Sequence, residues 1–339
     1  MAAAPPNPAP ILQLATGYWG SQALLTANRL GLFAGLGAEG ETAPQTAARI
    51  ATAERPTRLL LNACVALGLL ARAGDRYLLT PIAAAYLVPT SPAFLGDALR
   101  YSDDLYGPWG RLDEAVRHDR PTLPPADLLG GDSAQTRHFV RAMHQRALGI
   151  ARGLVAVVDL TGRRQLLDVG GGPGTYAALL TGRFPGLSAT VLDLGPVVAI
   201  ASEIVADLGA AERVHFLPGD CHTTPWPAGN DCLLISGFLH RESEASCRAL
   251  LARAHAALLP GGQLIVADVF TDAGGDGPPF ACLFGLNMLL SAEGGGVHPA
   301  PAMAQWMVDA GFTAVATHPL PPPCRTPPWW ACVADAVAD

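Results

Sequence analysis

Lysine is absent from this sequence of 339 residues, so all 22 basic residues are arginines. Charge of either sign is scarce: charged residues make up 15% of the chain, and the formal net charge is −7 at pH 7. Binding to a polyanion requires concentrated positive charge, which this composition does not supply. The composition therefore argues against a nucleic-acid partner.

Paired cysteine motifs are also absent. The seven cysteines are odd in number, are scattered along the chain, and include no C-x-x-C pair. Such cysteines are typical of small buried hydrophobic residues in a reducing cytosol, and not of a disulfide framework or a zinc site. We therefore expect no metal centre.

Long hydrophobic runs and a leader segment are missing as well. No apolar run approaches the roughly 20 residues that span a bilayer. Residues 1–10, for which we expect a disordered tail, have no basic segment followed by an apolar core, as a signal peptide would. Hydrophobic residues still make up 50% of the chain, as in a well-buried globular protein. These features predict a cytoplasmic protein that does not contact membranes.

The stretch from Arg164 to Tyr176 predicts a buried strand, a tight turn and the start of a helix. Its apolar run ends at Asp168, and glycines follow at alternate positions, Gly170, Gly172 and Gly174. Glycine adopts positive φ and has no Cβ, so a ligand can approach the backbone of this turn. Free N–H groups at the helix start favour an anionic or polar ligand head.

Polar residues recur where later strands end. Three further strands are expected. The strand over 189–193 ends at Asp193, the strand over 213–217 leads to Asp220, and the strand over 231–236 leads to His240. Ligands bind at this carboxyl edge in open α/β sheets. The alternative is that these residues only cap helices. Because the succession is uncommon, we favour a ligand site.

Strands and helices alternate from residue 165 onward, which predicts an α/β fold with a mainly parallel, doubly wound sheet of seven strands. The remaining expected elements are helices over 244–259, 280–290 and 301–310 and strands over 263–268, 314–317 and 329–334. The last two strands are expected as an antiparallel pair at one edge.

The N-terminal part predicts a different, mainly helical unit. Residues 11–36 carry apolar side chains at helical spacing, a stripe that a partner chain or the monomer itself must cover. Helices over 46–51 and 57–73 follow, and then a hairpin that turns at residues 74–75. This order is typical of a winged helix.

A winged helix raises the alternative of a DNA-binding regulator. The second helix would have to enter the major groove with polar and basic side chains facing outward. That segment is mostly apolar, and its only basic residues are Arg58 and Arg72. We therefore discount DNA binding.

The central glycines read G-x-G-x-G, unlike the dinucleotide pattern G-x-G-x-x-G. Here the chain resembles class I S-adenosylmethionine-dependent methyltransferases, and more narrowly the small-molecule O-methyltransferases of plants and of bacterial natural-product pathways. The resemblance covers nearly the whole chain. Its motifs are D-V-G-G-G-P-G (168–174), R-F-P-G-L (183–187), L-D-L-G-P (192–196), P-G-D-C (218–221), L-H (239–240), L-L-P-G-G (258–262), L-N-M-L (286–289) and A-G-F (310–312).

The resemblance implies a domain order and a homodimer. Residues 11–95 would form a winged-helix-like dimerisation domain, and residues 96–160 a helical linker with substrate-pocket helices. Residues 161–339 would form a Rossmann-like catalytic domain that binds S-adenosylmethionine.

The resemblance also implies how the methyl donor is held. Its amino-acid portion would contact Asp168, Gly170, Gly172 and Gly174, and its ribose would contact Asp193 and Leu194. Its adenine would contact Asp220 and Cys221. Its reacting end would lie along Ser236 and Gly237.

His240 is the general base that the resemblance implies, since it matches the family's histidine after the fourth strand; alternatively, it only shapes the pocket. The family commonly supports this histidine with two carboxylates. Asp268 matches the first, as a shorter side chain than the usual glutamate, and Val297 stands where the second is expected. A base that loses one carboxylate partner is less basic and less well oriented. Methylation of carbon or nitrogen, which needs only placement or a weak base, therefore stays open beside methylation of oxygen.

The acceptor is expected to be a small, flat, aromatic or hydrophobic molecule, because the candidate pocket residues are largely apolar. The expected contacts are Trp109, Met143, His144, Phe284, Asn287, Met288 and His298. Several of these could equally be core residues. A metal pair of His240 and His298 is a weaker alternative, since no carboxylate lies at a recognisable spacing. A relative that binds the donor but performs other chemistry also stays open.

Overall fold

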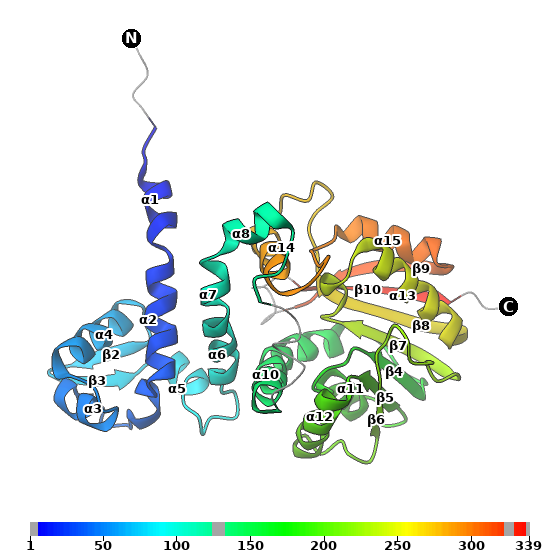
Figure 1. The fold of residues 1–339 in the computed structure, drawn as a ribbon. Coiled ribbons are helices and arrows are strands. Elements are labelled where there is room, and N and C mark those ends of the chain that lie inside the picture. The colour runs from blue at the N-terminus through cyan, green and yellow to red at the C-terminus, as the bar shows by residue number, and fades with distance from the viewer. Residues whose placement is uncertain (1–5, 124–132, 322–328, 337–339) are drawn as a thin grey trace, which may run out of the picture. The chain divides into compact units, whose positions relative to one another are not determined.

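The computed structural model describes residues 6–123, 133–321 and 329–336. Its chain divides into two compact units, Met1–Asp104 and Leu105–Asp339 (Figure 1). Of the tail expected over residues 1–10, residues 1–5 lie outside the described part, and helix α1 (Ala9–Thr16) begins inside that range. Residues 124–132 of the expected helical segment also lie outside it.

The first unit is a winged helix. It contains a three-stranded antiparallel sheet in the order β1-β3-β2. Its further elements are α2 (Tyr18–Arg29), η1 (Leu32–Gly35), β1 (Glu41–Thr42), α3 (Ala43–Arg49), α4 (Glu54–Ala66), β2 (Leu70–Ala73), β3 (Arg76–Leu79), α5 (Pro81–Tyr86) and α6 (Gly96–Asp104). Phe33, Leu61 and Tyr77 lie at the centre of its core.

One element boundary in this unit was predicted wrongly. The helix expected over 57–73 ends at Ala66, and residues Leu70–Ala73 form the first strand of the hairpin. Gly68 has φ +73°, a left-handed conformation that terminates helices. The apolar residues on both sides of this glycine suit either a helix or a strand, so their pattern did not reveal the break.

The second unit is built on a seven-stranded sheet in the order β6-β5-β4-β7-β8-β10-β9. The strands β6, β5, β4, β7 and β8 are neighbours in this order and run parallel. Strand β10 pairs antiparallel with both β8 and β9, which confirms the expected antiparallel pair at the edge. The strands are β4 (Gln165–Val169), β5 (Ser188–Asp193), β6 (Val214–Pro218), β7 (Asn230–Ser236), β8 (Leu258–Val269), β9 (Phe312–Pro319) and β10 (Trp329–Ala336).

Helices cover both faces of this sheet, so the fold is doubly wound (Figure 1). Apolar side chains of α10, α11 and α12 pack on one face, and those of α13 and α15 on the other. The helices are α7 (Tyr106–Trp109), α8 (Leu112–His118), α10 (Ser133–Val157), α11 (Thr175–Arg183), α12 (Gly195–Asp207), η2 (Leu239–Arg241), α13 (Glu244–Ala257), α14 (Pro279–Ser291) and α15 (Ala300–Asp309).

The cysteines of the described residues are unpaired thiols. Five are buried as expected, whereas Cys282 is half-buried, and Cys324 lies outside the described residues. Within the part of the chain that the structure describes, no helix is both long and apolar enough to cross a bilayer.

The central strands should dominate the stability of the second unit. Leu167 in β4 is completely buried, so Leu167→Ala should lower the free energy of unfolding by about 2–5 kcal/mol through lost burial and a cavity. Leu259→Ala, at a position 45% exposed, should change it by at most about 0.5 kcal/mol. Denaturant titration measures both variants, and equal losses would contradict the assigned core.

Candidate active site

The glycine turn after β4 requires its glycines for two different reasons. Gly170, Gly172 and Gly174 have φ of +64°, +55° and +70°, which strains any residue with a Cβ. A Cβ on Gly170 would also lie 2.7 Å from the Phe238 ring, whereas a Cβ on Gly172 would meet nothing within 4 Å. Gly170 therefore permits close packing, and the backbone at Gly172 stays open to a ligand.

Asp193 at the end of β5 is tied to this turn. Its Oδ2 accepts a hydrogen bond from the backbone N–H of Gly172 at 2.7 Å, and its Oδ1 accepts from that of Leu194 at 2.7 Å. Burial raises the pKa of Asp193, and these two hydrogen bonds act in the opposite direction. The carboxylate thus holds the turn in place and lies beside the open backbone.

Asp168 at the end of β4 is a buried carboxyl group without a hydrogen-bond partner of normal geometry among the described residues. Burial, reinforced by the negative charge of Asp193, raises the pKa of Asp168 from 3.8 to about 7, and the backbone of Ala177 opposes this only in part. The hydroxyl of Ser236 at the end of β7 is likewise buried and unpartnered. Unsatisfied buried polar groups are costly, so both are suited to a polar ligand.

The methyl donor expected from the sequence fits these groups. S-adenosylmethionine carries an ammonium group, a carboxylate, hydroxyls and adenine ring nitrogens. Its ammonium group can pair with the isolated carboxyl group of Asp168, and its hydrogen-bonding groups can satisfy the hydroxyl of Ser236. Gly170, Gly172, Asp193 and Ser236 all lie at the carboxyl ends of the neighbouring strands β5, β4 and β7. The residues present therefore suit the donor.

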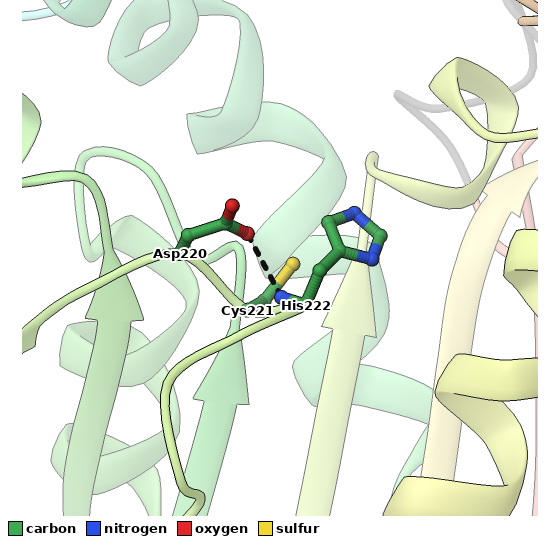
Figure 2. A group of neighbouring side chains, drawn as sticks. All are labelled: Asp220, Cys221 and His222. Atoms are coloured by element: carbon green, nitrogen blue, oxygen red, sulfur yellow. Dashed lines mark hydrogen bonds between the residues drawn. The ribbon is translucent and has the colours of Figure 1, made fainter.

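Asp220, Cys221 and His222 follow β6 and lie close together (Figure 2). Their potential metal-binding atoms lie within 4.8 Å of one another. Burial raises the pKa of the Cys221 thiol to about 12, and the Asp220 carboxylate accepts a hydrogen bond from the His222 backbone N–H at 2.8 Å. The three side chains belong to consecutive residues, and exposed acidic groups of this kind commonly lie together without an ion. This group therefore gives no support for a metal centre.

His240 lies in η2, directly after β7, and is only 8% exposed. Its Nδ1 lies 2.6 Å from Oδ1 of Asp268 on the neighbouring strand β8. A carboxylate accepts, so Nδ1 carries the proton and Nε2 is the nitrogen that can take another. Asp268 is held in turn by the backbone N–H of Val269 at 2.7 Å. The shorter carboxylate therefore still reaches the histidine.

Aromatic side chains of α14 border His240. The Phe284 ring lies edge-on to the His240 ring with centroids 4.9 Å apart, and Phe280 stacks on Phe284 at 5.7 Å. Asn287, one turn further along α14, accepts a hydrogen bond at Oδ1 from Nε1 of Trp109 at 2.9 Å. Four of the expected acceptor residues and the expected base thus belong to one region: Trp109, Phe284, Asn287 and Met288, with His240.

His144 on α10 lies beside the glycine turn. Its Nδ1 is 2.8 Å from the Thr175 hydroxyl, at the first residue of α11. Burial, together with the charge of Arg141, lowers the pKa of His144 and favours its neutral form. Met143 precedes it and is half-buried. Contact of Met143 and His144 with the acceptor stays a prediction.

His298 makes its polar contacts away from His240. Its Nε2 lies 3.0 Å from the Glu242 carbonyl oxygen and 3.5 Å from the Cys247 sulfur. The Gly296 N–H donates to the His240 carbonyl at 2.9 Å, so this loop is bonded to the turn that carries the histidine. Val297 packs against the core. These separate contacts do not favour a metal pair of His240 and His298.

Two residues of this region were not found by sequence reasoning. Phe238 packs against Gly170, and Thr175 contacts His144 across 31 positions of sequence. Both contacts arise from tertiary packing, and no local pattern indicates them. Thr175 could have been noted only as a polar residue at a helix start.

Comparison with known proteins agrees with this geometry. The O-methyltransferase domain model matches residues 109–313, and the O-methyltransferase dimerisation domain model matches residues 12–89. A 3-hydroxy-5-methyl-1-naphthoate 3-O-methyltransferase of Streptomyces sahachiroi is 37% identical over 91% of each chain. The tetracenomycin polyketide synthesis 8-O-methyl transferase of Streptomyces glaucescens is 34% identical over 92% of this chain and 93% of its own.

A solved structure is similar over the full length of both chains. It is that of human N-acetylserotonin methyltransferase in complex with S-adenosylmethionine, which has a TM-score of 0.88 and 26% sequence identity. The fold and the site define an S-adenosylmethionine-dependent methyltransferase. The chain belongs to the O-methyltransferase family that carries an N-terminal dimerisation domain.

The unpartnered carboxyl group of Asp168 predicts a pH dependence of the ligand-free protein. A carboxyl whose pKa is raised on folding stabilises the folded state fully below its unfolded pKa, and this contribution is lost as pH rises through the folded pKa. For Asp168 the window runs from 3.8 to about 7. Asp168→Asn should therefore raise the free energy of unfolding, relative to the wild type, more at about pH 8 than at about pH 5.

Denaturant titration of both proteins at the two pH values tests this group, because titrating groups that do not interact with Asp168 cancel in the difference. The same variant should bind S-adenosylmethionine more weakly. An equal difference at both pH values would show that Asp168 is not a buried, raised-pKa carboxyl.

Proposed function

We propose that this protein transfers a methyl group from S-adenosylmethionine to the hydroxyl oxygen of a small aromatic natural product, with His240 as general base. The observation that carries the proposal is the buried contact between His240 Nδ1 and Asp268, with Phe284 against the same imidazole. It supports a proton-accepting group next to an aromatic-lined space.

The donor would supply a methyl group bound to a positively charged sulfur. The acceptor oxygen would attack the methyl carbon in line with the bond to sulfur, and the sulfur would leave. The chain's main task is to align acceptor and donor, which can supply much of the rate. We assign the backbone of the glycine turn, Asp168 and Asp193 to the donor's polar groups. Ser236 and Gly237, directly before the turn of His240, are assigned to its reacting end.

The base acts through Nε2. Asp268 holds the proton on Nδ1, so the Nε2 lone pair is available to accept the hydroxyl proton of the acceptor as the oxygen attacks. The same carboxylate stabilises the imidazolium that results. Val297 offers no second carboxylate, so orientation of the ring rests on Asp268 and on packing against Phe284.

The acceptor class is inferred from the walls of the site and from the relatives. Phe280 and Phe284 form a stacked pair on which a flat ring can pack. The Streptomyces relatives are named for a hydroxynaphthoate and for tetracenomycin, both aromatic. We therefore assign a fused-ring aromatic hydroxyl compound to this site.

Removal of the base should separate binding from chemistry. His240→Gln should lower kcat/KM for a naphthol acceptor by about 10²–10⁴-fold, because proton acceptance is lost. Its affinity for S-adenosylmethionine, measured by calorimetry, should stay within about threefold of the wild type. Methyl transfer at a near wild-type rate would contradict the proposal and favour a carbon or nitrogen acceptor that needs only placement.

His255→Gln is the matched control for this variant. His255 on α13 is packed edge-on against Phe312 on β9 at 5.1 Å, as His240 is against Phe284, but it is half-buried and makes this contact with a different strand. It should reduce stability without a selective loss of methyl transfer.

We also propose that two copies of the chain associate through their N-terminal helices. Large apolar side chains of α1 and α2 are exposed: Ile11 71%, Leu12 62%, Leu14 84%, Tyr18 51% and Trp19 62%. A contiguous apolar patch of this kind marks an interaction surface. It overlaps the part of the chain matched by the O-methyltransferase dimerisation domain.

Charge placed in this patch should weaken the dimer. Trp19→Arg combined with Leu14→Arg should raise the dimer dissociation constant by roughly 30-fold or more, as for loss of an interface hot spot. Sedimentation velocity over a concentration series measures this constant. Leu259→Arg, at an exposed leucine of the catalytic unit, is the control. A wild-type protein that stays monomeric would contradict the assignment.

A further inference from the structure

A single hydrogen bond fixes the orientation of a side-chain amide near the proposed base. Trp109, the last residue of α7, lies with Nε1 2.9 Å from Oδ1 of Asn287 on α14. An indole N–H can only donate, so the oxygen of the amide, and not its nitrogen, must face Trp109. The two ends of the Asn287 amide are therefore distinguished by chemistry.

The amide nitrogen of Asn287 is then directed away from Trp109 with its donors unused. Among the described residues, none accepts a hydrogen bond from Nδ2. Asn287 is nevertheless only 8% exposed. The residue is therefore largely buried, but its Nδ2 is not among the fully enclosed unpartnered atoms, so a ligand can reach it. A ligand oxygen that accepts from this donor is favoured over an analogue that lacks the oxygen.

This donor lies on the same side of α14 as Phe284, because residues three apart share a helix face. The Phe284 ring is the one that contacts the His240 imidazole at 4.9 Å. The amide of Asn287 therefore lies one helical turn from the ring that borders the proposed base. A donor and a base so placed are close enough to act on one acceptor molecule.

We propose that Trp109 is a positioning residue that makes Asn287 a fixed hydrogen-bond donor, so that the site selects aromatic hydroxyl compounds carrying a second, hydrogen-bond-accepting oxygen. A ring carbonyl or carboxylate supplies such an oxygen. The location of the acceptor rests on the proposed function, and the polarity requirement goes beyond it. Trp109, expected from the sequence to contact substrate, acts through Asn287.

Ligand binding to the full chain loaded with S-adenosylhomocysteine tests this inference. The probes are naphthols with an acetyl group at successive ring positions, each paired with the naphthol that carries an isopropyl group there instead. The pair differs by one carbonyl oxygen at nearly constant size. A neutral hydrogen bond corresponds to about 3- to 10-fold in affinity, so at least one acetyl compound should bind that much more tightly than its partner. No preference at any position would overturn the proposal.

Two variants identify the residues responsible. Trp109→Phe keeps an aromatic side chain, although a smaller one, and removes the N–H, so the amide can rotate and the acetyl preference should fall to within about twofold. Asn287→Asp keeps an oxygen toward Trp109 and replaces the donor with a second acceptor, so the preference should vanish or reverse. An unchanged preference in Trp109→Phe would overturn the positioning role.

Tyr77→Phe is the matched control. It removes a similar aromatic-to-asparagine hydrogen bond, 2.7 Å from the Tyr77 hydroxyl to Asn62 Oδ1, in the N-terminal unit. It should leave the acetyl preference unchanged, and loss of the preference in this variant would show that the effect of Trp109→Phe is only structural.

Because the readout is binding and not turnover, failure of this inference is distinguishable from failure of the proposed function. An acetyl preference that depends on Trp109, in a protein that methylates none of the naphthols, would support the inference and contradict the proposed function. Methyl transfer to acetyl and isopropyl naphthols alike, with no difference in binding, would support the proposed function and contradict the inference.

Discussion

The pairing of β7 with β8 is the constraint on which the proposed chemistry depends. In this parallel pair Ser236 lies opposite Ala267, and the Gly237 N–H donates to the Ala267 carbonyl at 2.9 Å. The chain leaving β7 is therefore held beside the end of β8, where Asp268 meets His240. A slip of one residue would turn Asp268 to the other face of the sheet and remove the support of the base.

On the donor side of the site, a carboxylate at the end of a strand again fixes a neighbouring turn. Asp193 on β5 bonds the glycine turn after β4, while Asp168 on β4 is buried without such a bond. The carboxylate of Asp193 thus holds the turn, whereas the carboxyl group of Asp168 is isolated in a buried place, where a cation can stabilise its charged form. We propose that the donor satisfies this unpartnered group when it binds.

Sequence patterns predicted the doubly wound sheet, the antiparallel edge pair and the winged helix, because strand period, glycine spacing and turn residues are local signals. They misplaced the end of α4, because the apolar residues around Gly68 suit either a helix or a strand. The resemblance indicated His240 and Asp268, but only the structure shows that the shorter carboxylate reaches the ring. The hydrogen bond from Trp109 to Asn287 spans 178 positions and depends on how α7 packs against α14, which no local pattern encodes.

The most direct test of the central claim is the position of the transferred methyl group. The enzyme is incubated with S-adenosylmethionine carrying an isotopically labelled methyl group and with an aromatic acceptor that offers a hydroxyl, an amine and an electron-rich ring carbon, and the product is examined by nuclear magnetic resonance. A base formed by His240 and Asp268 predicts the label on the hydroxyl oxygen. Label on ring carbon or nitrogen would contradict the account and leave positioning alone as the mechanism.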